Sequence, residues 1–262
     1  MNQETNSSWR RDDLKNPHRA GDKRHRVRTM FSGIAGSYDL LNHLLSLNLD
    51  RRWRRRAVQL ALVGPGQSVL DLCCGTGDLA LEFARSHPDL AEIIGVDFAW
   101  PMLEIAAQKS EKLIRRQRHD RCNNIVFKWL CQDVEHLDLG ADHFDCVSCA
   151  FGVRNLQDLP TGLKNIFHLL KPGGRVVILE FALPRNRLLG WGYACYFRLV
   201  LPVIGSIIAA DRNGAYHYLP ASVATFDAAV QIDSLLRKFG FTDIRVERLS
   251  AGAVLAFVAL KP

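Results

Sequence analysis

The sequence predicts an α/β fold, with a doubly wound, mostly parallel sheet of seven strands that closes with an antiparallel hairpin. Between residues 68 and 181, apolar runs of strand length alternate with segments whose apolar residues recur at helical spacing. Near the end of the chain, two strand-like segments are separated only by Ser250-Ala251-Gly252. Three residues cannot form the crossover that joins parallel strands, so this last pair must be antiparallel.

The N-terminal part of the chain is expected to contain a tail followed by helices. Residues 1–28 are polar and basic and show no apolar periodicity, so we expect a disordered basic tail there and one folded domain over residues 29–262. A helical region is expected over Val27–Gln59, where leucines recur at helical spacing. Gly64-Pro65-Gly66 then breaks the chain.

The region that follows alternates between strands and helices. The expected strands are Ser68–Cys73, Glu92–Val96, Ile125–Leu130, Phe144–Ala150 and Arg175–Phe181. The expected helices between them are Thr76–His87, Pro101–Lys109 and Asp158–Leu170. Pro101 suits the first position of its helix, and Pro172-Gly173-Gly174 ends the last one. A further helix, Val230–Phe239, precedes the hairpin strands Asp243–Leu249 and Ala253–Leu260.

Composition limits the classes of protein to which the chain can belong. Of its 262 residues, 48% are apolar and 23% are charged, which is the balance of a globular protein. The most apolar stretch, 188–210, is interrupted by Arg198 and Pro202, so it is not expected to span a membrane. The net charge of +7 gathers partly in Arg51–Arg56, a block that suits solvent or an anionic surface.

The seven cysteines are irregularly spaced, which favours reduced thiols and a cytoplasmic protein. Cys146 and Cys149 lie three positions apart on an expected strand, so their side chains face opposite sides of the sheet. They therefore cannot form a metal site together, and the sequence predicts no bound metal.

The most informative local pattern is a buried strand that runs into a glycine turn and then a helix. Gly75 and Gly77 let a ligand approach the backbone closely, and Asp97, at the end of the next strand, suits the two hydroxyls of a ribose. The spacing Gly75-x-Gly77-x-x-Ala80 also fits a dinucleotide site. Asp71 separates the two interpretations, because its carboxylate would repel a pyrophosphate and attract the ammonium and sulfonium groups of S-adenosylmethionine.

This pattern, an acid four residues before the first glycine and a second acid later, resembles the first motif of the class I, Rossmann-like methyltransferases. The resemblance implies that S-adenosylmethionine is the cofactor. It also implies that Asp133 accepts the adenine amine while Val134 packs near the ring. The remaining residues assigned to the cofactor site by the same resemblance are Thr76, Met102 and Ala150.

Further segments narrow the resemblance to the ubiquinone/menaquinone biosynthesis C-methyltransferase family, from about Val27 to the end. They are Tyr38-Asp39 with Asn42, Phe151-Gly152-Val153-Arg154-Asn155, Leu170-Lys171-Pro172-Gly173-Gly174 and Leu179-Glu180-Phe181. Ala150 departs from the serine usual in the family, and Cys73-Cys74 replace small residues. The resemblance implies methyl transfer to a ring carbon of a polyprenylated quinol, without a metal.

Three residues are the candidates for this chemistry. Arg154 would stabilise the phenolate by its charge, since an arginine is rarely a base. Tyr38 and Asn155 would orient the ring hydroxyl or a water molecule. Loss of one proton is the step for which the protein must provide help, because the sulfonium is already a good electrophile.

The expected partners follow from an apolar substrate. A helical insert at about 188–222 is interpreted as a lid over the isoprenoid tail, and peripheral contact with the inner face of the membrane is expected. No nucleic acid is expected, although a methyltransferase acting on RNA or on another lipophilic phenol is the alternative. A scaffold without activity and an NAD-dependent oxidoreductase are disfavoured by the acidic residues. Whether the pathway is that of menaquinone or of ubiquinone stays open. Whether the protein forms a homodimer or joins a quinone-synthesis assembly also stays open.

Overall fold

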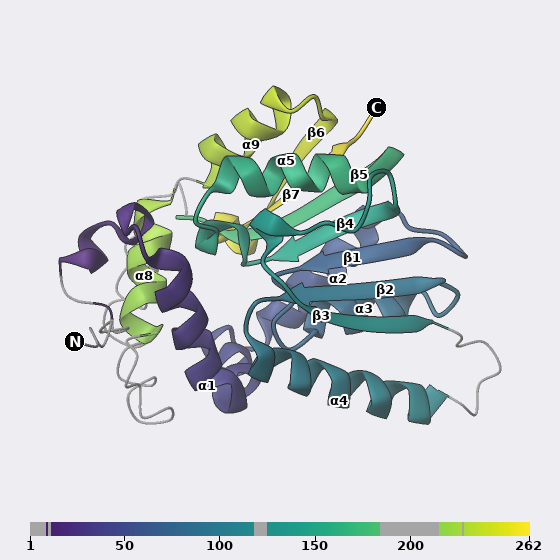
Figure 1. The fold of residues 1–262 in the computed structure, drawn as a ribbon, viewed down its shortest axis with the longest axis horizontal. Coiled ribbons are helices and arrows are strands. Elements are labelled where there is room, and N and C mark those ends of the chain that lie inside the picture. Colours follow the sequence, from purple (N-terminus) through teal and green to yellow (C-terminus); the bar gives the residue numbers. More distant parts are fainter. Residues whose placement is uncertain (1–8, 10–11, 118–124, 184–214, 227) are drawn as a thin grey trace.

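A seven-stranded sheet forms the centre of the fold in the computed structural model, which describes residues 9, 12–117, 125–183, 215–226 and 228–262 (Figure 1). The strands are β1 (Ser68–Leu72), β2 (Glu92–Asp97), β3 (Val126–Cys131), β4 (Phe144–Ala150), β5 (Leu170–Phe181), β6 (Thr242–Leu249) and β7 (Val254–Leu260). Their order is β3-β2-β1-β4-β5-β7-β6, and β7 runs antiparallel to both of its neighbours. The predicted doubly wound sheet with its antiparallel hairpin is confirmed.

Helices cover both faces of this sheet (Figure 1). On one face, α5 (Leu159–Leu169) and α9 (Ala228–Lys238) contribute to one apolar cluster, and on the other, α2 (Leu49–Ala61) and α3 (Asp78–Ser86) contribute to a second. Cys149 belongs to the first cluster and Cys146 to the second. The prediction that these two thiols face opposite sides of β4 is therefore confirmed.

A third apolar cluster lies at the carboxyl ends of the strands, where three further helices meet. They are α1 (Lys23–Leu45), α4 (Trp100–Gln117) and α8 (Ala215–Thr225). Met30 of α1, Met102 of α4 and Tyr218 of α8 are almost completely buried in it. The short 3-10 helices are η1 (Asp13–Lys15), η2 (Pro17–Arg19), η3 (Val134–His136), η4 (Val153–Asn155) and η6 (Ser250–Gly252). This cluster places α1 and α8 over the carboxyl ends of the strands, where ligands of doubly wound sheets bind.

The predicted disordered tail over residues 1–28 is wrong for residues 12–28, which form η1, η2 and the first turns of α1. Arg26 pairs with Asp13 and Asp22, and the ring of Trp9 stacks on Tyr218 with 4.5 Å between centroids. Ion pairs and a single buried indole hold this segment, so apolar periodicity does not reveal it. Residues 1–8 and 10–11 lie outside the described residues.

Two observed elements are at least five residues longer than expected. α4 continues from Lys109 to Gln117, and β5 begins at Leu170. The prediction that Pro172-Gly173-Gly174 ends the preceding helix is wrong, because α5 ends at Leu169 and this turn lies inside β5. The register between β4 and β5 shifts between Phe144 and Cys146, which accommodates that turn inside the strand. Of the predicted lid, residues 188–214 lie outside the described residues, and residues 215–222 belong to α8. None of the described helices is both long and apolar enough to cross a membrane.

Candidate active site

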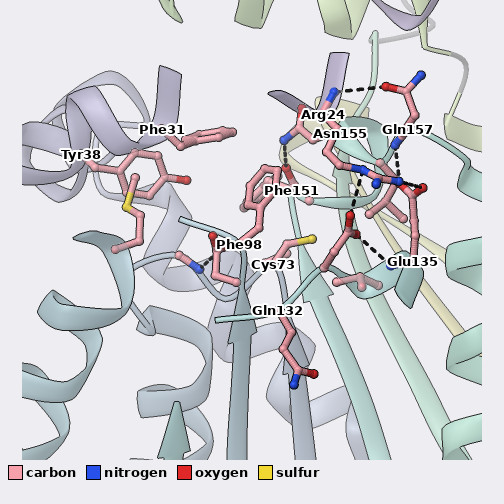
Figure 2. Close-up of a pocket in the computed structure, with 18 residues that line it drawn as sticks. Arg24, Phe31, Tyr38, Cys73, Phe98, Gln132, Glu135, Phe151, Asn155 and Gln157 are labelled. Atoms are coloured by element: carbon pink, nitrogen blue, oxygen red, sulfur yellow. Dashed lines mark hydrogen bonds and ion pairs between the residues drawn. The ribbon is translucent and has the colours of Figure 1, made fainter. Parts of the chain in front are cut away.

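A pocket with an empty volume of about 630 Å³ opens at the carboxyl ends of β1, β2, β3 and β4. The strand order reverses between β1 and β4, and ligands of doubly wound sheets bind at such a point. Figure 2 shows Phe31 and Tyr38 of α1 on one side of the pocket, and Arg24, Glu135 and Gln157 on the other. Its lining combines apolar and aromatic side chains with a few polar groups, as sites for small molecules do.

The glycine turn after β1 forms the floor of this pocket. Cys73, Gly75 and Gly77 have φ angles of 50°, 53° and 79°, the left-handed region that glycine adopts without cost. A Cβ added to Gly75 would meet only Tyr38, at 3.7 Å, so the surface above it is open to a ligand. A Cβ on Gly77 would lie 2.8 Å from the ring of Trp129, so this glycine serves packing.

Asp97 fixes the turn and also faces the pocket. One carboxylate oxygen accepts a hydrogen bond from the backbone N–H of Gly75 and the other from that of Ala99, each at 2.9 Å. Burial raises the pKa of Asp97 to about 6, although both N–H groups oppose the shift. Each carboxylate oxygen retains acceptor capacity, which can receive the hydroxyls of a ribose.

Acidic side chains also gather after β3. Asp133 accepts a hydrogen bond from the N–H of Glu135 at 3.0 Å, and Glu135 accepts one from the N–H of Gln157. Arg24 reaches both carboxylates from α1, with its Nε 2.8 Å from Asp133 and an Nη 2.7 Å from Glu135. Val134 and Leu156 add apolar surface beside them, so this end of the pocket suits a flat ring that carries an amine.

Six of the nine residues predicted to bind the cofactor line the pocket. They are Gly75, Asp97, Met102, Asp133, Val134 and Ala150. Thr76 and Gly77 do not line it: the hydroxyl of Thr76 donates to Asp39 at 2.5 Å, and Gly77 precedes α3. Both are held on the far side of the turn.

Asp71 is also absent from the lining of the pocket. It is 1% exposed, and one carboxylate oxygen accepts a hydrogen bond from Ser148 at 2.7 Å, while the other has no hydrogen-bond partner. Burial raises the pKa of Asp71 to about 7. Its contact with the cationic end of a cofactor stays a prediction.

A second cavity, with an empty volume of about 750 Å³, adjoins the first and shares Phe31, Tyr38 and Phe151 with it. Most of its lining is apolar or aromatic. The polar side chains that line it are Asn42, Ser46, Asp50, Arg54 and Arg154. The rings of Phe151 and Phe181 stack with 4.4 Å between centroids, and Trp53 meets both edge-on. An aromatic ring with an apolar tail fits this lining.

The three predicted catalytic residues lie at the junction of the two cavities. Tyr38 lines both, Asn155 lines the first and Arg154 the second. Burial raises the pKa of Tyr38, so its phenol remains protonated at neutral pH. Asn155 accepts a hydrogen bond from the hydroxyl of Tyr218 at 2.9 Å.

Arg154 is more strongly bound within the protein than the sequence indicates. Its guanidinium lies 2.9 Å from Glu180, donates to the carbonyl of Phe151 and lies over the ring of Phe181. The guanidinium is 5% exposed and the carboxylate of Glu180 is 0% exposed. This buried ion pair joins the turn after β4 to the end of β5.

Many of the residues that surround these three were not predicted from the sequence. Phe98 directly follows the predicted Asp97 in the sequence, and Glu135 directly follows the predicted Val134. Their positions next to these residues could have indicated both. Arg24 lies in the segment taken as a tail, where no pattern indicates it. Other residues of the two linings that were not predicted are Phe31, Gln132, Gln157, Leu41, Leu45, Asp50 and Arg54.

Next to the second cavity, His43, Asp50 and Asp78 each place a potential metal-ligand atom within 4.8 Å of one another. Arg54 already forms ion pairs with both of these acids, and Lys109 forms one with Asp78. The positive charge that a metal would supply is therefore present in the side chains themselves. We assign this group to the packing of α1, α2 and α3.

The strand order, the glycine turn and the acids after β2 and β3 define a class I S-adenosylmethionine-dependent methyltransferase. Solved structures agree with this fold. A methyltransferase of Methanococcus maripaludis superposes with a TM-score of 0.58 at 16% identity, over 87% of this chain and 91% of that one. One of Thermotoga maritima has a TM-score of 0.55 at 20% identity, over 89% and 99% of the two chains.

The chain belongs to the ubiE/COQ5 methyltransferase family, whose pattern it matches over residues 19–261. A relative from Geobacter sulfurreducens, named ubiquinone/menaquinone biosynthesis C-methyltransferase UbiE, is 43% identical over 86% of this chain and 84% of its own. A demethylmenaquinone methyltransferase of Thermus thermophilus is 42% identical over 89% of this chain and 100% of its own. The resemblance inferred from the motifs is confirmed.

Proposed function

We propose that the protein transfers a methyl group from S-adenosylmethionine to a ring carbon of a polyprenylated quinol, in the synthesis of menaquinone, ubiquinone or both. The observation that carries the proposal is the apolar, aromatic second cavity, which shares Phe31, Tyr38 and Phe151 with the cofactor pocket. The names of the relatives from Geobacter sulfurreducens and Thermus thermophilus support the same substrate class.

The residues of the first pocket fit S-adenosylmethionine. Asp97 would accept hydrogen bonds from the ribose, Asp133 would accept the adenine amine, and Val134 and Met102 would pack against the rings. The open surface above Gly75 and the unpartnered oxygen of Asp71 suit the amino-acid end. The cofactor supplies an electrophilic methyl group on a sulfonium. Asp71 would supply the negative charge that matches its positive charges, while Asp97 would hold its ribose.

The second cavity would hold the quinol in line with the cofactor pocket. Phe151 and Phe181 offer a stacked aromatic wall to the ring, and Leu41 and Leu45 offer apolar surface to the isoprenoid chain. Exclusion of water by this lining strengthens every charge interaction with the ring oxygen. Alignment of the two reactants is a large contribution that such a site can make without covalent catalysis.

Deprotonation of the quinol makes its ring carbon nucleophilic, so the site must stabilise a phenolate. Tyr38 is protonated and lies between the two cavities, where it can donate a hydrogen bond to the ring oxygen. Arg154 supplies a positive charge at the wall of the second cavity, although Glu180 balances much of it. Asn155 would orient a water molecule or the hydroxyl from the cofactor side.

The location of the protein in the cell is part of the same proposal. We propose that it works in the cytoplasm and visits the inner face of the membrane, where a polyprenylated quinol resides. Of the insert expected at about 188–222, the described residues belong to α8, which contributes Tyr218 and Leu219 to the second cavity. A homodimer or an assembly of quinone-synthesis enzymes is compatible with this placement.

The test is complementation of a bacterial strain that lacks its own quinone C-methyltransferase, with mass spectrometry of the lipid extract. We expect the missing methyl group to return to menaquinone, to ubiquinone or to both, and the masses identify which. The control is Asp97→Ala, which should bind S-adenosylmethionine weakly and restore little methylation. If the wild-type protein binds S-adenosylmethionine and the quinones stay unmethylated, the substrate class is wrong and another lipophilic phenol or RNA becomes the candidate.

A further inference from the structure

Three leucines at the end of α1 face solvent instead of the core. Leu40 is 63% exposed, Leu44 is 45% exposed and Leu47, in the turn between α1 and α2, is 77% exposed. We call them the leucine tip. Leu40 and Leu44 are four residues apart and so lie on one side of the helix, next to the turn that carries the third. Grouped exposed leucines differ from the scattered apolar residues that any surface carries.

The leucine tip lies directly beside the second cavity. Leu41 and Leu45, the next residue after each of the first two exposed leucines, line that cavity. The end of α1 therefore presents one apolar side to the cavity and an adjacent apolar side to solvent. These two sides are about 100° apart around the helix.

The conformation of the turn makes the exposure of Leu47 informative. Leu47 and Asn48 have φ angles of 52° and 60°, in the left-handed region. Asparagine tolerates this region, but a leucine does so rarely and at a cost in energy. The turn thus holds a large apolar side chain outward in a conformation that glycine or asparagine would adopt more easily.

Basic residues flank the leucine tip at the start of α2. Arg51 and Arg52 are exposed, and neither forms an ion pair with a described residue. Arg55, one turn further, is also exposed and lies 3.4 Å from Glu82. Two unpaired guanidinium groups beside exposed leucines match a surface that is anionic at its face and apolar just beneath it.

We propose that the leucine tip and Arg51 with Arg52 form a membrane-docking site. The leucines would enter the boundary between headgroups and acyl chains, and the arginines would bind the phosphates of anionic lipids. This inference rests on the proposed function, because the docked orientation sets the end of α1 that lines the second cavity against the bilayer. The isoprenoid tail of the quinol could then pass along α1 without crossing water.

Vesicle co-sedimentation of the full chain tests the proposal. We expect the wild-type protein to bind vesicles of phosphatidylcholine with phosphatidylglycerol, and to bind pure phosphatidylcholine more weakly. Leu44→Ser with Leu47→Ser should lower the affinity for the mixed vesicles at least about tenfold. The matched control is Leu62→Ser, because Leu62 is 69% exposed and also left-handed, with a φ of 51°, but lies at the other end of α2. This control should bind as the wild type does.

The electrostatic half of the site is tested separately. Arg51→Gln with Arg52→Gln should lower binding to the mixed vesicles about tenfold and leave weak binding to phosphatidylcholine unchanged. The control pair is Arg115→Gln with Arg116→Gln, at the far end of α4 (Figure 1), which should have little effect. Added salt should weaken wild-type binding and have little effect on the Arg51 and Arg52 variant.

Turnover separates this proposal from the proposed function. The Leu44 and Leu47 variant should methylate a quinol with one isoprene unit, offered in solution, as fast as the wild type, and should be slower on a long-chain quinol embedded in vesicles. If the wild type methylates neither quinol but binds vesicles as expected, the proposed function is contradicted and the docking proposal stands. The docking proposal is overturned if the wild type does not bind vesicles or if Leu62→Ser loses as much affinity. It is also overturned if the double leucine variant converts a dimer to a monomer while vesicle binding persists, because the tip would then be a self-interface.

Discussion

The buried ion pair between Arg154 and Glu180 gives the sharpest prediction. Glu180→Gln keeps the size of the side chain and removes its charge. The guanidinium of Arg154 is only 5% exposed and lies 2.9 Å from the carboxylate, so the substitution leaves a positive charge buried without its counterion. Glu180 also accepts hydrogen bonds from the backbone N–H groups of Arg154 and Phe181, at 3.2 and 2.9 Å. The amide cannot accept at both of its ends.

The size of the effect follows from these contacts. Removal of one partner of a buried ion pair costs about 3–5 kcal/mol, so the free energy of unfolding of Glu180→Gln should fall by that amount. In a protein of this length, the loss corresponds to a fall of roughly 10 °C in the melting temperature. Urea denaturation followed by circular dichroism measures it. The double variant with Arg154→Met should recover part of the loss, because it removes the unpaired charge.

The control is the exposed ion pair between Asp233 and Arg237 on α9, whose side chains are 30% and 64% exposed. Asp233→Asn should unfold as the wild type does, because water screens such a pair. A loss below about 1 kcal/mol for Glu180→Gln would refute the reasoning, since such a loss is typical of an exposed pair. Arg154 would then be free to turn toward a substrate. In the variant Arg154→Met, turnover should fall while the affinity for S-adenosylmethionine is retained, because Arg154 lines only the second cavity.

Three further predictions concern the cofactor pocket and the glycine turn at its floor. Asp97→Ala should weaken S-adenosylmethionine binding at least about tenfold by calorimetry, because hydrogen bonds to a charged acceptor are lost. Unchanged affinity would remove Asp97 from the site. In the wild type, affinity should rise with pH through about 6, where Asp97 ionises, and on through about 7, where Asp71 ionises, and level off above that. Gly77→Ala should destabilise the fold by about 2 kcal/mol or more, since its Cβ would lie 2.8 Å from an indole ring at a φ of 79°. Gly140→Ala is the control, with the same φ and nothing within 4 Å, and an equal loss would show that backbone conformation alone is responsible.

Patterns local in sequence predicted the sheet and the floor of the site. Apolar runs of strand length place the five parallel strands that precede the hairpin. Four of these strands are largely buried, which requires nearly continuous apolar residues, whereas β3 lies at the edge of the sheet and is partly exposed. The short connection before β7 fixes its direction. Gly75 and Asp97 follow directly from where β1 and β2 end, so the position of the cofactor pocket could be predicted before any contact was known.

The wall contributed by α1 could not be predicted in this way. Arg24 lies in a basic segment without apolar periodicity, and its place is set by the acids Asp133 and Glu135, more than 100 residues later. The second cavity has the same origin. It combines side chains of α1, α2, β5 and α8, whose meeting depends on how the helices pack over the sheet. No local pattern contains that information.

The turn after β4 gives Arg154 and Asn155 contacts within the protein beside the catalytic roles predicted for them. Phe151 has a φ of 60°, and its N–H donates to the carbonyl of Leu179 at 2.8 Å. Its own carbonyl accepts from the guanidinium of Arg154 and from the amide of Asn155. Both side chains thus turn back onto the residue whose ring separates the two cavities. The motif that the sequence presents as a catalytic cluster also fixes that ring, so its first contribution to methyl transfer is the alignment of the two reactants.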